Sequence, residues 1–140
     1  LIQLPGKASM DHYNKLENIL KNIRQHDKEP QWKLAVEFRN DEWYINETTE
    51  LLQAYDASMV LHDISKGKNQ ALNKGAAFAY IRFHGVKGDY RGSYPDESLI
   101  NYASKTEQLL SKGLPVYIYF NNTIGDAYSN AVRMKELLDI

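Results

Sequence analysis

Short apolar runs alternate along the chain with longer segments in which apolar residues have helical spacing. In the run 34–36 every residue is apolar, which is typical of a strand covered on both faces. The turn pair Pro5-Gly6 ends the first run. The runs predict five strands, at 1–4, 32–38, 57–61, 78–83 and 116–120.

Apolar residues three or four positions apart predict four helices between and after these runs. Residues suited to a cap or a first turn indicate where the helices begin, at Ser9, Asn46, Pro95 and Asp126. Other segments are too polar, or too rich in glycine and proline, to continue an element. We expect a break or a loop at 28–30, 62–75 and 84–95.

The order of these elements predicts an α/β fold with parallel strands and right-handed crossovers. Both an open doubly wound sheet and a closed barrel fit this order. No G-x-G-x-x-G follows a predicted strand, so the dinucleotide-binding signature of the open sheet is missing. Glu37 and Arg39 share a face of one strand, and Arg82 and His84 share a face of another. These charged residues favour the barrel, because a barrel interior provides them with partners and water.

Four motifs occur in order along nearly the whole chain, and Tyr90 and Tyr94 follow the third of them. They are Leu1-Ile2-Gln3-Leu4-Pro5, Ala35-Val36-Glu37-Phe38-Arg39-Asn40 with Trp43, Tyr80-Ile81-Arg82-Phe83-His84-Gly85, and Tyr117-Ile118-Tyr119-Phe120-Asn121-Asn122. Together they resemble the YecE-like family, which is domain-of-unknown-function family seventy-two. The resemblance implies no particular reaction and no cofactor.

The resemblance implies a TIM-type parallel β/α barrel of about 250 residues. Residues 1–140 would supply strands four to eight, the C-terminal part of a single barrel domain. We therefore expect the chain to be a piece of a longer polypeptide. Such a piece leaves two strand edges unpaired, and open edges invite pairing. Self-association, or an N-terminal segment that is missing here, is the expected consequence.

Composition narrows the classes of function. The 140 residues include 17 basic and 18 acidic side chains, so a nucleic-acid partner is not favoured. No apolar run is long enough to span a bilayer, so no membrane partner is expected. The chain has no cysteine, which fits a reducing, cytoplasmic location and excludes thiolate chemistry.

The charged residues at two strand ends are the first candidates for chemistry. Glu37 is a candidate general acid or base, and Arg39 is a candidate anion clamp. The alternative for Glu37 is a structural ion pair with Arg82 across the barrel. Arg82 could bind a phosphate or carboxylate, and His84 is the side chain best matched to proton transfer at neutral pH.

The loop after His84 adds candidates for ligand binding. Its glycines allow backbone amides to approach an anion, and Lys87 and Arg91 supply positive charge. The alternative is a solvated basic loop. Tyr90 and Tyr94 could stack on a base or sugar, or could pin the loop to the barrel.

Asn121 and Asn122 end the last strand and offer amide groups at the mouth of the barrel. We expect one of them to face the cavity, and alternation alone does not say which. No metal is predicted. His62, Asp63, His84 and Glu37 are conceivable ligands, but no H-x-H or H-x-x-x-H spacing occurs.

Two functions fit these features. The first is an enzyme or enzyme-like barrel that binds or hydrolyses a phosphorylated or otherwise anionic ligand at the mouth. The second is a non-catalytic binding or scaffold barrel whose polar cluster holds the interior together.

Overall fold

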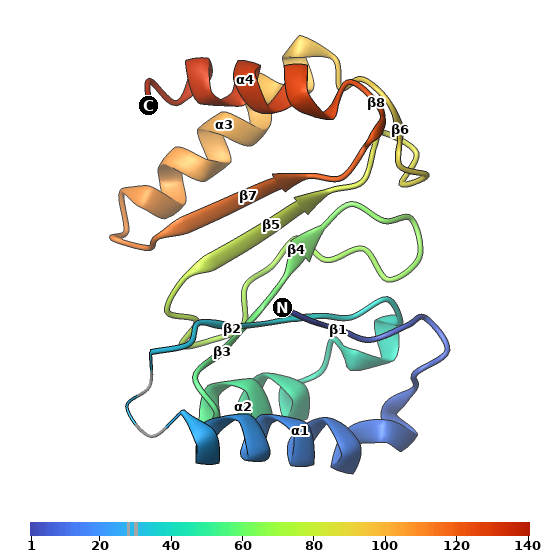
Figure 1. The fold of residues 1–140 in the computed structure, drawn as a ribbon, viewed down its shortest axis with the longest axis vertical. Helices are drawn as coiled ribbons and strands as arrows, with labels where there is room; N and C mark the ends of the chain where they lie inside the picture. The colour runs from blue at the N-terminus through green and yellow to red at the C-terminus, as the bar shows by residue number, and fades with distance from the viewer. Residues whose placement is uncertain (28, 30) are drawn as a thin grey trace.

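Parallel strands lie at the centre of the fold in this computed structural model, which describes residues 1–27, 29 and 31–140 (Figure 1). One ladder has the order β1–β2–β3 and a second has the order β4–β5–β7. The strands are β1 (Ile2–Gln3), β2 (Leu34–Glu37), β3 (Ala57–Met59), β4 (Leu61–His62), β5 (Ala79–Phe83) and β7 (Val116–Phe120). Only Val60 separates β3 from β4, so a single stretch of chain joins the two ladders.

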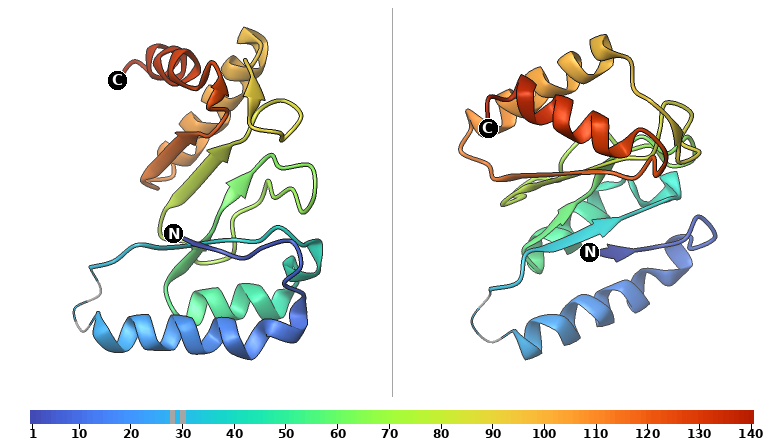
Figure 2. Two further views of the ribbon diagram at one scale, coloured as in Figure 1. Left: turned by 45° about the vertical axis from the view of Figure 1, so that its right-hand side comes forward. Right: turned by 45° about the horizontal axis from the view of Figure 1, so that its top comes forward.

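Helices lie on one side of each ladder. They are α1 (Tyr13–His26), α2 (Asn46–Ala54), α3 (Asp96–Leu110) and α4 (Ala127–Leu137), with short 3-10 turns η1 (Met10–His12) and η2 (Asp41–Trp43). Figures 1 and 2 show α1 and α2 beside β1, β2 and β3, and α3 and α4 beside β5 and β7. We call the strand face that meets these helices the outer face. The predicted alternation of strands and helices is therefore confirmed.

The outer face is apolar and the opposite, inner face carries the polar residues. Leu34, Val36 and Phe38 join α1 and α2 in one buried core, and Ile81 and Phe83 join α3 and α4 in another. Consecutive residues of a strand point to opposite faces, so the residues that alternate with these apolar ones face inward. This alternation places Ala35, Glu37 and Arg39, and likewise Tyr80, Arg82 and His84, on the inner face.

Helix starts differ slightly from the prediction. The Ser9 hydroxyl donates to Asp11 Oδ2 at 3.1 Å and caps no amide, because η1 intervenes before α1. Asn46 is the first residue of α2, and Ile45 occupies the N-cap position. The predicted break at 28–30 includes Lys28 and Pro30, which lie outside the described residues.

The loops after β5 and β7 form a small parallel ladder of their own, made of β6 (Arg91–Gly92) and β8 (Ile124–Gly125). A Cβ at Gly125 would lie 2.4 Å from the carbonyl oxygen of Gly92, so only glycine allows this approach. The predicted loop at 84–95 is thereby ordered. Among the helices of the described chain, none is long and apolar enough to cross a membrane.

Candidate functional site

Glu37 lies between two arginines on the inner face, at the carboxyl ends of the strands. Its Oε1 accepts from Arg39 Nε at 2.8 Å, and its Oε2 accepts from Arg82 Nη1 at 2.5 Å. The Glu37 side chain is fully buried, while those of Arg39 and Arg82 are 21% and 15% exposed. The expected ion pair between Glu37 and Arg82 is present, and Arg39 completes a triad that we call the mouth cluster.

Two amides fix the guanidinium groups further. Gln3 Oε1 accepts from Arg39 Nη2 at 3.0 Å and from Arg82 Nη1 at 2.9 Å. With its carboxamide oxygen facing Arg82, Asn121 accepts from Nε at 3.1 Å and from Nη2. All three nitrogens of Arg82 are thus engaged. The side chain of Tyr90 is a further hydrogen-bonding partner of the Arg39 guanidinium group.

The mouth cluster determines the protonation state of Glu37. Burial raises the pKa of Glu37, but the hydrogen bonds from Arg39 and Arg82 and the charge of Arg82 outweigh burial and bring the pKa below its ordinary value of 4.5. Glu37 is therefore a carboxylate at neutral pH and a weak base. It suits the positioning of arginines better than proton transfer.

His84 and Asp63 form a second polar group, next to the mouth cluster. Asp63 Oδ1 accepts from the backbone amide of His84 at 2.7 Å and lies 3.3 Å from His84 Nδ1. The other oxygen of Asp63 accepts from the Tyr94 hydroxyl. Because a carboxylate only accepts, Nδ1 carries a proton. Nε2 is buried and has no partner among the described residues.

His62 packs edge-on against His84, with ring centroids 6.1 Å apart. Its Nε2 lies 2.8 Å from the carbonyl oxygen of Phe38, so this nitrogen donates and Nδ1 is an acceptor. Burial lowers the pKa of His62 more than the Phe38 carbonyl and the charge of Glu37 raise it. His62 is therefore neutral at pH 7, and its buried Nδ1 is an acceptor without a partner among the described residues.

Tyr90 is held close to both groups by a constrained backbone. Its φ is 67°, in the left-handed region that a bulky residue rarely adopts. Its amide donates to the carbonyl oxygen of His84 at 2.6 Å, and its ring packs edge-on against His84 with centroids 5.3 Å apart. The Tyr90 side chain also contributes to raising the pKa of Arg39, so the two lie near one another.

The other predicted site residues differ in how they are placed relative to this centre. Lys87 and Arg91 are exposed, and their side chains make no hydrogen bond or ion pair within the described chain. Tyr94 is buried, and its hydroxyl also accepts from the Gly85 amide at 2.6 Å, so it pins the loop. Asn122 is fully buried and donates to Asn130 Oδ1 at 2.9 Å. Of the two asparagines, Asn121 is the one that joins the mouth cluster.

Gln3 is not among the site residues predicted from the sequence, which indicates Asp63 only as a conceivable metal ligand. A signal existed for Gln3, because a polar residue at an inward position of an apolar strand needs polar partners. Asp63 directly follows β4, where a carboxylate at a strand end has several uses. Within the part of the chain that the structure describes, no three His, Asp or Glu side chains are arranged to hold a metal ion.

Stability should fall in acid because two carboxylates are held ionised. Burial raises the pKa of Asp63, yet hydrogen bonds from His84 and Tyr94 bring it below 3.8, and the pKa of Glu37 likewise lies below 4.5. A lowered folded-state pKa stabilises the fold fully above the ordinary pKa, and this contribution is lost as the pH falls through the folded-state pKa. Urea unfolding between pH 7 and about pH 3 should show the free energy of unfolding decreasing below about pH 4.5. A constant value over this range would contradict the two assignments.

Comparison with known proteins identifies the family. The chain matches the family model "Protein of unknown function DUF72" over residues 1–140. Its structure is similar to that of a DUF72 family protein from Enterococcus faecalis V583, with 20% identity and a TM-score of 0.80, over 99% of this chain and 57% of that chain. A DUF72 family protein from Thermotoga maritima MSB8 has 27% identity and a TM-score of 0.75, over 99% and 56% of the two chains. No curated protein matches the chain.

The chain thus spans less than three fifths of the length of these relatives, 57% and 56%. The parallel strands with helices on their outer face form part of a β/α barrel, and this confirms the predicted fold class. Because the family model covers residues 1–140, the chain belongs to the DUF72 family of proteins of unknown function.

Proposed function

We propose that the mouth cluster binds a small anionic ligand, such as a phosphate monoester, with Arg39 as its main contact. One observation carries this proposal: two guanidinium groups share a single buried carboxylate. The cluster therefore holds one positive charge that Glu37 does not balance. Arg39 is the more exposed of the two arginines, at 21%.

The arginines are already ordered for binding. Glu37 and Gln3 each bond to both guanidinium groups, so little side-chain freedom is lost when a ligand arrives. The planar fork of arginine matches two oxygens of a phosphate or carboxylate, and a charge-assisted hydrogen bond is stronger than a neutral one. Glu37 acts in this proposal as a positioning residue.

The surroundings of Arg39 supply the rest of the proposed site. Tyr90 lies near Arg39, so a ligand on Arg39 would meet the Tyr90 ring. Lys87 and Arg91 lie in the same loop and would attract an anion at longer range. In β/α barrels the loops after the last strands often hold a phosphate.

His84 is our candidate for proton transfer if the bound ligand reacts. Asp63 orients its ring, and Nε2 is a buried nitrogen without a partner among the described residues. Assays with a panel of phosphate esters distinguish an enzyme from a protein that only binds the ligand. Turnover that is lost in His84→Gln would indicate an enzyme, whereas binding without turnover would indicate a binding protein.

Calorimetric titration with inorganic phosphate at constant ionic strength tests the binding site. Arg39→Gln should weaken binding by about ten- to a hundredfold, because a hydrogen bond to a charged group contributes about 1.5–3 kcal/mol. The control is Arg133→Gln on α4, which removes an exposed arginine that pairs with Asp96. Equal affinities of wild type and a folded Arg39→Gln variant would reject the site and favour the scaffold function.

A further inference from the structure

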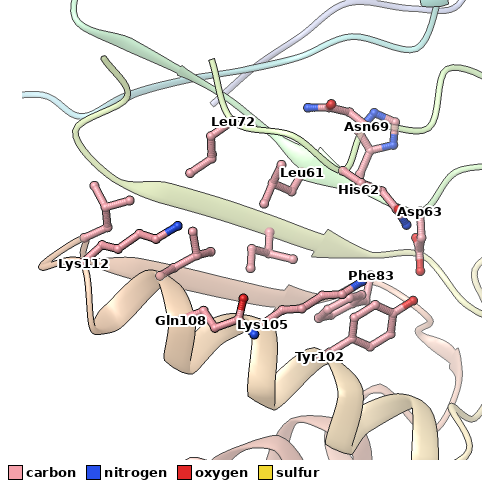
Figure 3. A pocket seen from close by; sticks show the side chains of 14 residues that line it. Leu61, His62, Asp63, Asn69, Leu72, Phe83, Tyr102, Lys105, Gln108 and Lys112 are labelled. Atoms are coloured by element: carbon pink, nitrogen blue, oxygen red, sulfur yellow. The ribbon is translucent and has the colours of Figure 1, made fainter. Parts of the chain in front are cut away.

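A groove of about 390 Å³ lies on the outer face of β4 and β5, away from the mouth cluster. Figure 3 shows that β5 and Leu61 form its floor and α3 forms one wall. Leu72, from the segment between β4 and β5, closes the opposite side. The volume lies within the range of small-molecule sites.

The groove exists because one helix of the strand–helix alternation is replaced by a loop. Residues 63–78, all of which are described, connect β4 to β5 without forming a helix. The outer faces of the other strands are covered by α1, α2, α3 and α4. β5 pairs with β4 on one side and with β7 on the other, so the floor of the groove lies inside the strand array and not at its edge.

The lining of the groove is mainly apolar. Its apolar members are Leu61, Leu72, Ile81, Phe83, Tyr102, Leu109 and Leu114. Apolar side chains around an open groove stay in contact with water unless something covers them, and burying them is favourable. The groove therefore suits a ligand with an apolar chain.

Two lysines give the groove a preference for negative charge. Lys105 and Lys112 line it from α3 and from the turn after that helix, about 10 Å apart at the rise of an α-helix. Neither forms an ion pair with any described residue. Figure 3 shows the Lys112 ammonium directed into the groove, at the end away from Asp63. Asp63 disfavours an anion at its own end, so the negative group belongs beside Lys112.

We propose that this groove binds a single-chain amphiphile with a carboxylate head group, such as a medium-chain fatty acid. The carboxylate pairs with Lys112, and the chain runs along Leu61, Ile81 and Phe83. An α-helix of a partner protein, about 10 Å across with its side chains, needs more room than the groove offers. This site is independent of the anion site proposed at Arg39.

Titration of the chain with straight-chain carboxylates below their micelle concentrations tests the proposal, followed by the methyl NMR signals of the lining leucines. Each added methylene should tighten binding by about fourfold until the chain fills the groove. Decanol serves as the ligand without charge. Binding that does not change with chain length would overturn the proposal, as would binding of anionic vesicles alone.

Three variants locate the binding site. Lys112→Gln should weaken decanoate binding at least fivefold and leave decanol binding unchanged. Gln108→Trp places an indole in the groove from an exposed position of α3 and should abolish binding of both ligands. Ser104→Trp, also exposed on α3 but outside the groove, is the matched control. The assignment would be overturned if a folded Gln108→Trp variant still bound decanoate. It would also be overturned if an acidic helical peptide were the only competitor that displaced decanoate.

Discussion

Replacing Glu37 with glutamine should lower the free energy of unfolding by about 3–5 kcal/mol. Glutamine keeps the shape of the side chain but removes the charge that holds Arg39 and Arg82 together. Both guanidinium groups are largely buried, at 21% and 15% exposure, so water replaces the lost partner poorly. Urea unfolding at pH 7 measures the change.

The exposed ion pair between Arg133 and Asp96 provides the control for this prediction. Asp96 is 57% exposed, and pairs of this kind contribute little because water solvates both groups. Asp96→Asn should therefore leave the unfolding transition almost unchanged. If the two variants were equally stable, the charge of Glu37 would not be holding the mouth cluster together.

Asp63→Ala should lower the free energy of unfolding by about 2–6 kcal/mol, because it leaves two buried donors without an acceptor at about 1–3 kcal/mol each. These donors are the backbone amide of His84 and the hydroxyl of Tyr94. The loop after β5 depends on both, since Tyr94 in turn accepts from the Gly85 amide. Hydrogen exchange at Gly85 and Tyr90 should therefore accelerate along with the loss of stability.

Asp89→Ala is the matched control in the same loop. Asp89 is exposed and accepts one backbone hydrogen bond, from the Arg91 amide at 3.2 Å. Its loss should leave exchange at Gly85 unchanged. Unchanged protection of Gly85 and Tyr90 in Asp63→Ala would show that the loop is held by other contacts.

The fold could be predicted from the sequence because its signals are local. Runs of apolar residues mark the strands, and spacing by two residues places Glu37 with Arg39 and Arg82 with His84. Parallel strands bring their carboxyl ends to one edge, so the polar residues at the strand ends predicted a polar cluster at that edge.

The pairing inside the cluster could not be predicted, because it depends on register and on loop paths. Nothing local indicates that Gln3 reaches both arginines or that Asp63 receives the Tyr94 hydroxyl. Alternation also does not continue past the end of β7, so it could not separate Asn121 from Asn122. The groove depends on α3 lying beside the polar segment 63–78, a tertiary contact without a local signal.

The central claim is that the mouth cluster carries an unbalanced positive charge that binds an anion. The most direct test compares the thermal stabilisation by phosphate, and by chloride at equal ionic strength, of wild type and Arg39→Gln. Arg39→Gln removes the positive charge that Glu37 does not balance, so phosphate should raise the melting temperature of wild type more than that of Arg39→Gln. Equal effects of phosphate and chloride on both proteins would contradict the claim.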